Sequence, residues 1–244
     1  MKKGLASHNK RHIDEENPYW VSFSDLMSGL LVIFILASVA LIIELTQKTN
    51  QVDAGIEELK KAEQVRRNIV FDIKEELARR NVFVEIAEND TVIRIPDKTL
   101  SFLSGEDELP KNSEMQDAVR EIGLVLHQAI MKEGRLKYLD TVFVEGHTDS
   151  DNIYYRGKGN WGLSVDRAIS VWNIWQKDIE IEPKFGVLDN VYGQKLFSVS
   201  GYAATRRVNT TEINDSEKSQ NRRIDIRFTV KRPTIADLER IVAQ

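Results

Sequence analysis

The sequence predicts one membrane-spanning α-helix, then a charged helical segment, then an α+β domain with helices on one face of a mixed β-sheet. Residues 26–43 form an uncharged apolar run, residues 46–80 repeat apolar side chains at helical spacing, and from residue 82 strand-like and helical segments alternate. The expected segments are an N-terminal tail (1–19), the transmembrane helix (20–45), a helical tether (46–80), the folded domain (81–232) and a C-terminal tail (233–244).

Composition argues against several classes of protein. Charged residues make up 30% of the 244 residues, which disfavours a membrane protein with many spans. No cysteine is present, so disulfides, thiol nucleophiles and cysteine-ligated metals are excluded. With four histidines, a histidine-rich metal site is not expected either, and we expect no cofactor. The net charge of −4 gives no electrostatic footprint for nucleic acid, so no direct nucleic-acid partner is expected.

The apolar run 26–43 is interrupted only by the small residues Ser28, Gly29 and Ser38. A span needs about 20 apolar residues, and including residues 19–23 reaches that length. The alternative is a buried core helix, but such helices seldom stay apolar around their whole circumference for five turns. No small-residue cleavage site follows Ile43, so we expect a retained anchor rather than a signal peptide.

The flanks of the run predict its orientation. Four basic side chains precede it: Lys2, Lys3, Lys10 and Arg11. Tyr19 and Trp20 stand where interfacial aromatic residues gather, and few basic residues follow the run before Lys60. The positive-inside rule therefore favours a cytoplasmic N-terminus, one pass through the membrane, and a C-terminal domain outside. A cysteine-free exterior fits a bacterial periplasm without requiring it, and we expect a single-pass protein of the bacterial inner membrane.

The segment 46–80 carries one apolar stripe with spacings of three and four. The stripe consists of Val52, Ile56, Leu59, Ala62, Val65, Ile69, Ile73 and Leu77. Such a stripe is typical of an amphipathic helix. It could serve as a tether, a parallel coiled coil, a plug for a channel, or a surface helix of the following domain, and the sequence leaves these alternatives open.

The remaining chain predicts a succession of short elements. Two alternating segments, 82–86 and 91–95, flank Asn89-Asp90 and predict a hairpin. Helices are expected over 113–131, capped by Ser113 or Asn112, and over 163–175. Further strands are expected over 141–145, 197–202 and 223–230. About 150 residues are enough for one stable core.

Four motifs follow one another in this domain. They are Val-Phe-Val-Glu-Gly-His-Thr-Asp at 142–149, Asn-Trp-Gly-Leu-Ser-Val-Asp-Arg-Ala at 160–168, Gly-Tyr-Ala-Ala at 201–204 and Asn-Arg-Arg-Ile at 221–224. Together they resemble the OmpA-like peptidoglycan-binding domain, in the form carried by MotB, the B subunit of the flagellar motor stator. The resemblance covers roughly residues 90–230.

The resemblance implies a pocket for the diaminopimelate part of the cell-wall peptide. It places Asp149 on the ligand's ammonium group, Arg167 on a carboxylate, and Asn160 and Leu163 in the pocket lining. One anionic and one guanidinium partner suit a zwitterionic ligand, because arginine offers a bidentate fork to a carboxylate. The alternative is a simple salt bridge between Asp149 and Arg167.

Three further features of this domain stay open. The loop 150–159 is longer than in outer-membrane members of the family, and its side chains could gate the pocket or touch glycan. The motif 221–223 could brace the fold or bind ligand. His147 and Asp149, with Ser164 as nucleophile, could suggest hydrolysis, but no Gly-x-Ser-x-Gly elbow surrounds the serine, which argues against an enzyme.

Asp25 is the candidate ion-carrying residue. It opens the apolar run five positions after Trp20, about 7–8 Å further along a helix. A carboxylate in the membrane is costly, so it marks either an interfacial cap or an ion pathway. Ser28 and Gly29 follow at i+3 and i+4, where small residues let another helix approach closely. The stretch resembles the transmembrane helix of stator B subunits, whose aspartate near the cytoplasmic end binds the translocated ion.

The amino-acid sequence around Asp25 most resembles that of the stator-like B subunits of Zorya anti-phage defence systems. That resemblance implies a motor driven by an ion, expected to be H⁺. It also implies a multi-span A subunit of the MotA/ZorA kind, a second copy of the chain, peptidoglycan and the inner membrane as partners. The alternatives are a flagellar stator B subunit, or a passive peptidoglycan anchor that moves no ion and has no need of Asp25.

Overall fold

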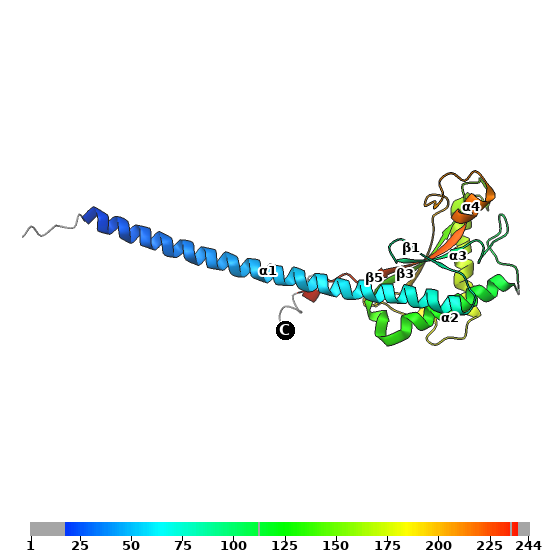
Figure 1. Cartoon of the computed structure of the whole chain (residues 1–244), viewed down its shortest axis with the longest axis horizontal. Helices are drawn as coiled ribbons and strands as arrows, with labels where there is room; N and C mark the ends of the chain where they lie inside the picture. The colour runs from blue at the N-terminus through cyan, green and yellow to red at the C-terminus, as the bar shows by residue number, and fades with distance from the viewer. Residues whose placement is uncertain (1–17, 112, 235, 239–244) are drawn as a thin grey trace, which may run out of the picture. The chain divides into compact units, whose positions relative to one another are not determined.

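The computed structural model describes residues 18–111, 113–234 and 236–238. Most of the expected N-terminal tail and the end of the expected C-terminal tail lie outside these residues. Two compact units divide the chain, with the boundary between Ala54 and Gly55. That boundary falls inside the first helix, α1, which runs from Pro18 to Arg79 (Figure 1).

The first part of α1 has the properties of a membrane span by length and composition. Its described residues from 19 to 37 are all exposed, and most of them are large and apolar. Ser28 donates its hydroxyl hydrogen to the Ser24 carbonyl oxygen at 2.7 Å, so this polar group is satisfied within the helix. The helix expected over 20–45 is therefore present, and its apolar surface needs an apolar surrounding.

The second unit, Gly55–Asp237, is built around a five-stranded mixed sheet in the order β1-β2-β5-β3-β4. The strands are β1 (Glu85–Ala87), β2 (Val92–Pro96), β3 (Leu139–His147), β4 (Phe197–Gly201) and β5 (Arg223–Val230). Only β3 and β4 run parallel; the other neighbours are antiparallel. The helices are the end of α1, α2 (Glu114–Met131), α3 (Gly159–Lys177) and the short α4 (Asp215–Asn221), with 3₁₀ segments at Lys132–Tyr138 and Phe185–Val187.

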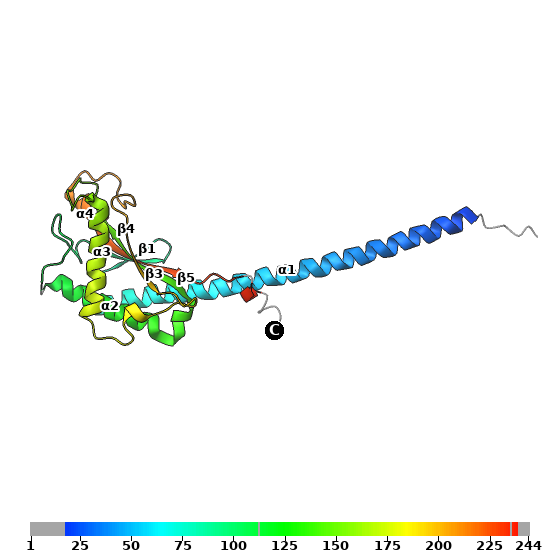
Figure 2. The ribbon, with the colours of Figure 1, turned by 180° about the vertical axis from the view of Figure 1, so that it is seen from behind.

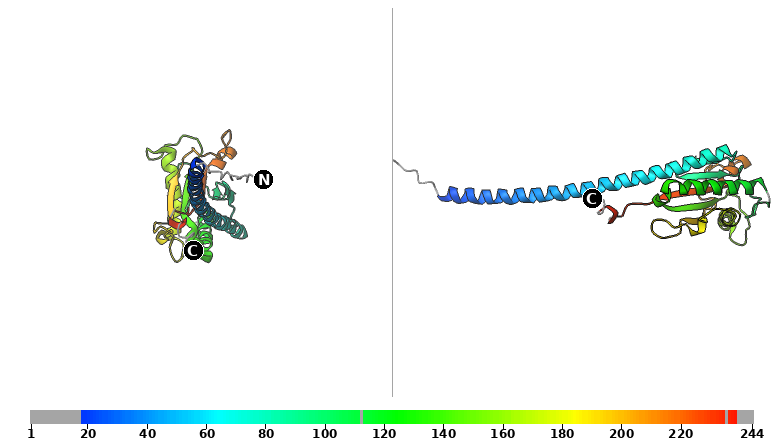
Figure 3. Two further views of the ribbon diagram at one scale, coloured as in Figure 1. Left: turned by 90° about the vertical axis from the view of Figure 1, so that its left-hand side faces the viewer. Right: turned by 90° about the horizontal axis from the view of Figure 1, so that it is seen from below.

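Helices cover one face of this sheet. Ile93, Ile226 and Val144 lie opposite one another across β2, β5 and β3, and all three belong to the buried core. The same core contains Ile73 of α1 and Trp175 of α3, along with the apolar side of α2. Figure 3 shows α2 beside the C-terminal part of α1. The predicted α+β architecture is thus confirmed.

The opposite face of the sheet is charged. The row next to the apolar one places Arg94, Asp225 and Glu145 opposite one another. Arg94 donates to Asp225 at 3.0 and 3.1 Å, and Arg227 donates to Glu145 at 2.9 to 3.1 Å. Alternation along each strand therefore separates an apolar core face from a face of paired charges.

The compact unit begins well before residue 81, where the sequence placed the domain boundary. Ile69, Val70, Ile73 and Leu77 of α1 are at most 1% exposed and form part of the core. Of the alternatives left open for residues 46–80, the surface helix of the following domain describes the part from Ala62 onward. The stripe marks a buried interface only in this part, since Val52, Ile56 and Leu59 are exposed, and sequence alone could not say what buries the rest.

Most other elements lie close to their expected positions. The expected hairpin is present as β1 and β2, although β1 is only three residues long. Three consecutive residues in the left-handed region, Glu88, Asn89 and Asp90, make its turn. Helix α2 begins after Ser113, whose side chain accepts a hydrogen bond from Gln116 N. Helix α3 starts four residues earlier than expected, and α4 was not expected at all.

Candidate functional site

A pocket of about 490 Å³ opens where several loops meet at the α4 end of the sheet. It is lined by residues that follow β2, residues that follow β3, the first turns of α3, and the region of α4. All four pocket residues predicted from the sequence line it: Asp149, Asn160, Leu163 and Arg167. Their role toward a ligand stays a prediction, but their convergence in one pocket is a structural fact.

Two glycines, one in β3 and one in β4, let α3 approach the sheet closely enough to form this pocket. A Cβ atom on Gly146 would collide with the Ser164 carbonyl oxygen, and one on Gly201 would meet the Ser164 hydroxyl. That hydroxyl accepts a hydrogen bond from Ala203 N at 3.1 Å and donates to Trp161 O at 3.0 Å. The start of α3 is therefore pinned across the ends of β3 and β4, which brings Asp149 beside the first turns of α3.

Asp149 is already paired in the pocket. Its Oδ2 accepts a hydrogen bond from Arg222 Nη1 at 2.9 Å, and its Oδ1 accepts one from Asp151 N at 3.3 Å. The alternative salt bridge to Arg167 is wrong, since the cation on Asp149 is Arg222. A carboxylate has about four lone-pair sites, so Asp149 keeps capacity for a ligand donor.

Arg222 donates hydrogen bonds to three carboxylates, that of Asp149 and two others. Its Nε and Nη2 donate to Asp97 Oδ2 at 3.2 and 3.0 Å, and its Nη1 also donates to Asp215 at 3.1 Å. Burial opposes the charge of Arg222, but the hydrogen bonds to Asp149, Asp97 and Asp215 outweigh it and raise the pKa of the guanidinium. Arg222 is thus a fixed cation of the pocket, and the sequence had not assigned it there.

Arg167 is 5% exposed and uses one edge of its guanidinium to hold the protein itself. Nε donates to Glu106 O at 2.9 Å, and Nη2 donates to Leu103 O at 3.0 Å. No described residue accepts a hydrogen bond from Nη1, so the edge formed by Nη1 and the second Nη2 hydrogen is the one that suits a carboxylate. Burial lowers the pKa of Arg167, while Asp97 and Asp149 act to raise it.

The other two predicted residues shape the pocket. Asn160 donates its amide to Asp151 O at 2.9 Å and Asp149 O at 3.4 Å, so it fixes the turn that carries the aspartate. Leu163 is 2% exposed and contributes apolar lining one turn before Arg167. Asn160, Leu163 and Arg167 are spaced by three and four residues, which places them on one face of α3.

In the motif 221–223, two residues stabilise the fold and one lines the pocket. Asn221 accepts hydrogen bonds from Val208 N and Asn209 N at 2.7 and 3.0 Å, which organises the preceding loop. Arg223 donates to Asp225 at 3.0 Å and to Arg206 O at 2.9 Å. The residue between them, Arg222, is the one that lines the pocket.

His147 and Ser164 do not form a nucleophile–base pair. His147 is 2% exposed, stacks on Tyr202 with ring centroids 5.4 Å apart, and lies 3.5 Å from Asp225. Burial and then the nearby Arg223 lower its pKa to about 3, so the ring is neutral at ordinary pH. Because Ser164 bonds to backbone groups instead, these two residues offer no hydrolytic geometry.

The protein falls into a recognisable class. Residues 102–222 match the model of the OmpA family, and the pocket lies within and beside that range. The chain thus combines an apolar N-terminal helix with an α+β domain that matches the OmpA family over residues 102–222 and has a fold similar to that of a MotB-like protein.

Particular relatives share most of its length. The chain is 28% identical to the Zorya protein ZorB of Escherichia coli O139:H28 over 236 residues, covering 90% of this chain and 83% of ZorB. Its fold is similar to a MotB-like protein from Desulfovibrio vulgaris, with a TM-score of 0.51, 17% identity, and 70% of this chain and 98% of the other covered. The periplasmic domain of Helicobacter pylori MotB gives a TM-score of 0.50, 17% identity, and coverage of 68% and 91%.

Proposed function

We propose that this chain is the B subunit of an ion-driven rotary motor in the bacterial inner membrane, anchored to peptidoglycan and acting in anti-phage defence. The similarity to ZorB over 90% of the chain is the observation that carries the proposal, because it extends beyond the OmpA-like domain. The N-terminus would be cytoplasmic and the compact unit periplasmic, as the basic residues before the apolar run favour.

The pocket would provide the anchor. A diaminopimelate terminus carries an ammonium and a carboxylate group on one carbon, and the pocket presents Asp149 and Arg167 from opposite sides of the β3–α3 turn. Both side chains are largely withdrawn from water, which strengthens charge-assisted hydrogen bonds to a ligand. Arg222 would hold Asp149 in place before the ligand arrives.

Asp25 would carry the ion. It lies in the apolar part of α1, where a charged carboxylate costs more free energy than a neutral carboxyl group. Protonation and release at Asp25 would couple inward flow of an ion, expected to be H⁺, to rotation of a ring of multi-span A subunits. Two copies of this chain, fixed to the wall, would form the stationary axis.

Binding of the full-length chain in detergent micelles to insoluble peptidoglycan tests the anchor. We expect the wild type to sediment with the wall and the double variant Asp149→Ala, Arg167→Ala to stay in solution. The matched control removes a remote surface ion pair, Asp189 and Lys195 at 2.7 Å, with the same two changes to alanine. Equal sedimentation of the pocket variant and the wild type would show that the pocket is wrongly assigned.

Phage plating efficiency on cells carrying the native locus tests the motor. Asp25→Asn keeps the shape and removes the titratable group, so we expect protection to be lost at normal membrane levels of the protein. Glu44→Gln is the matched control, since Glu44 lies on the same helix beyond the apolar run and pairs with Lys48. Retained protection in Asp25→Asn would favour a passive anchor, and no protection from the wild-type locus would favour a flagellar stator.

A further inference from the structure

Two loops far apart in sequence form the rim of the pocket. One follows β2 (residues 97–111), and the other joins β3 to α3 (residues 148–158). Both contribute lining residues, and Figures 1 and 2 show the first loop beside the N-terminal end of α3. The width of the pocket mouth therefore depends on what holds these two loops together.

The first loop is held by Arg167. The two hydrogen bonds from its guanidinium to Leu103 O and Glu106 O close a turn whose backbone also contains the bond from Glu106 N to Leu103 O at 3.0 Å. The guanidinium carbon lies 4.9 Å from the centre of the Phe102 ring, which lines the pocket. A ligand carboxylate on Arg167 would thus rest on the same side chain that fixes this loop.

The second loop is held to the first by four side chains, which we call the clasp: Asp107, Tyr155, Arg156 and Asp166. Tyr155 donates its hydroxyl hydrogen to Asp166 Oδ2 at 2.7 Å. Arg156 donates from Nη2 to Asp107 Oδ1 at 3.2 Å and from Nη1 to Asp166 Oδ2 at 3.5 Å. The clasp therefore joins both loops to α3 at the residue before Arg167.

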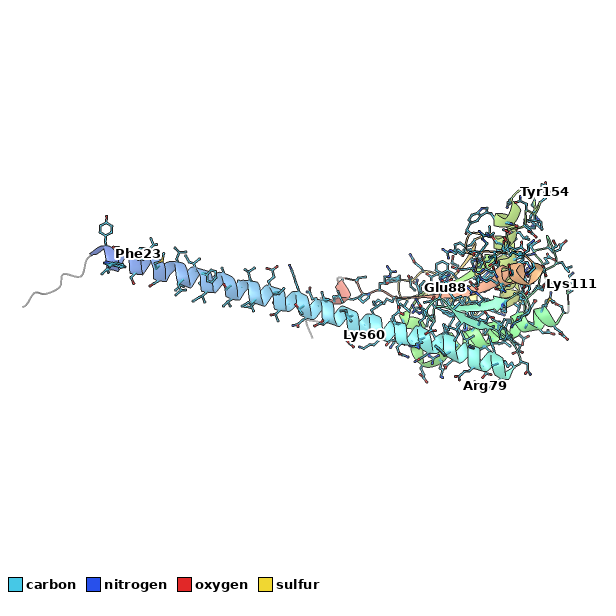
Figure 4. All side chains as sticks on the ribbon, turned by 45° about the horizontal axis from the view of Figure 1, so that its top comes forward. Phe23, Lys60, Arg79, Glu88, Lys111 and Tyr154 are labelled. Carbon is cyan, nitrogen blue, oxygen red and sulfur yellow. The ribbon has the colours of Figure 1, made fainter. Side chains whose placement is uncertain are left out.

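The Tyr155 hydroxyl is the buried part of the clasp. Tyr155 is 5% exposed, and burial, with Asp166 and Asp107 nearby, raises the pKa of its hydroxyl, so it remains a donor at physiological pH. Its neighbour Tyr154 is 89% exposed and points outward (Figure 4). The two adjacent tyrosines thus have opposite surroundings, and only the second is built into the pocket rim.

Ile153, two residues before Tyr155, contacts both the pocket and the first loop. It lines the pocket and lies against Gly105 of the first loop, where a Cβ atom would come within 3.3 Å of Ile153 Cδ1. Gly105 has φ +73°, a conformation that favours glycine. The contact between Ile153 and Gly105 therefore joins the two rim loops at the pocket, in addition to the clasp.

We propose that Tyr155 and Arg156 are positioning residues of the pocket: through Asp107 and Asp166 they lock the two rim loops together and so pre-organise the pocket for its ligand. This inference rests on the proposed wall-binding function. Pre-organisation raises affinity because the ordering cost of the loops is met before binding. Opening the clasp would leave the core intact and weaken ligand binding.

The test measures binding of meso-diaminopimelate to the full-length chain in detergent by calorimetry. We expect the dissociation constant of Tyr155→Phe to rise about tenfold, equivalent to 1.4 kcal/mol. Tyr154→Phe removes the same atom from the next residue and should bind like the wild type. Arg156→Gln, which changes a side chain 64% exposed, is the second clasp variant and should also weaken binding.

Amide hydrogen exchange separates positioning from mere stability. In the wild type, the ligand should slow exchange in residues 101–107 and 150–158 together. In Tyr155→Phe it should slow only the first segment, because Arg167 still holds that loop. Wild-type affinity in both clasp variants would overturn the inference and leave the proposed function standing. Failure of the wild type to bind this ligand or peptidoglycan would instead contradict the proposed function, and the positioning role would fall with it.

Discussion

Arg222 Nη1 lies 2.9 Å from Asp149 Oδ2, so the carboxylate expected to receive a ligand's ammonium group already has a cation beside it. The same guanidinium is held from its other edge by Asp97. Arg222 therefore does not compete freely for Asp149, because it is fixed by a second carboxylate. A ligand ammonium would join this arrangement as a second donor to Asp149 and offset the surplus of negative charge around Arg222.

Replacing Arg222 by glutamine should both weaken wall binding and destabilise the compact unit. Removing one partner of a buried ion pair costs about 3–5 kcal/mol, and the partial exposure of Arg222 places the loss near the lower end. Denaturant unfolding of the full-length chain measures the stability, and sedimentation with peptidoglycan measures the binding.

Arg207→Gln provides the control for Arg222→Gln, because Arg207 is more exposed and lies 3.6 Å from Glu212 outside the pocket lining. Only the Arg207 side of this pair is exposed, but the buried Glu212 keeps its hydrogen bonds from Ser150 N and Asn221, so the loss should stay at about 0–1 kcal/mol. If both variants bound the wall equally well, Arg222 would have no part in the pocket.

Acid should destabilise the compact unit through Asp225. Burial favours the protonated form of this carboxyl, but the hydrogen bond from Arg94 and the charge of Arg223 hold its pKa below the ordinary value. A carboxyl with a lowered folded-state pKa contributes stability above its unfolded pKa of about 3.9 and loses it as pH falls through the folded value. The temperature of the unfolding midpoint should therefore fall once the pH is lowered below about 4.

Glu212 acts in the same direction, since its pKa is also lowered. Thermal unfolding of the full-length chain between pH 3 and pH 7 checks this dependence. A stability that rises on acidification would be inconsistent with the charge pairing on the outer face of the sheet.

Gly146→Ala should disrupt the pocket indirectly, through the packing of α3 on β3. A Cβ atom there would overlap the Ser164 carbonyl oxygen, a backbone group that cannot rotate away. Overpacking typically costs about 1–3 kcal/mol and shifts backbone, so α3 should move away from β3. Gly134→Ala is the comparison, because no atom lies within 4 Å of its Cβ position, although its φ of +68° adds strain. The binding assay should separate the two, with wall binding lost only in Gly146→Ala.

The sequence predicted the local elements well because their signals are local. Ser113 caps α2 as expected, and the strand over 223–230 runs over those same residues. The start of α3 was placed four residues too late; two glycines, Gly159 and Gly162, stand in its first turn, and glycine is a poor helix former. In the structure Gly162 is needed, since a Cβ there would meet the side chains of Lys158 and Tyr155.

Part of the pocket was predicted from the sequence. The residues that were missed are brought together by the pairing of strands that lie far apart in the sequence. Asp149 and Arg167 came from motifs that sit on either side of one turn. Arg222 and Asp97 meet because Pro96 pairs with Arg223 across β2 and β5, a contact between residues more than 120 positions apart. No local pattern encodes that pairing, so the cation on Asp149 could not be identified from the sequence.

The position of the domain boundary leads to the last prediction. A fragment starting at residue 81 lacks Ile69, Val70, Ile73 and Leu77, whose burial is worth about 1.5–3 kcal/mol each, or roughly 6–12 kcal/mol together. Domains are stable by about 5–15 kcal/mol, so this fragment should unfold or aggregate at room temperature. A fragment of residues 55–238 should unfold cooperatively by circular dichroism. A cooperative transition of equal midpoint in both fragments would mean that α1 adds nothing to the core.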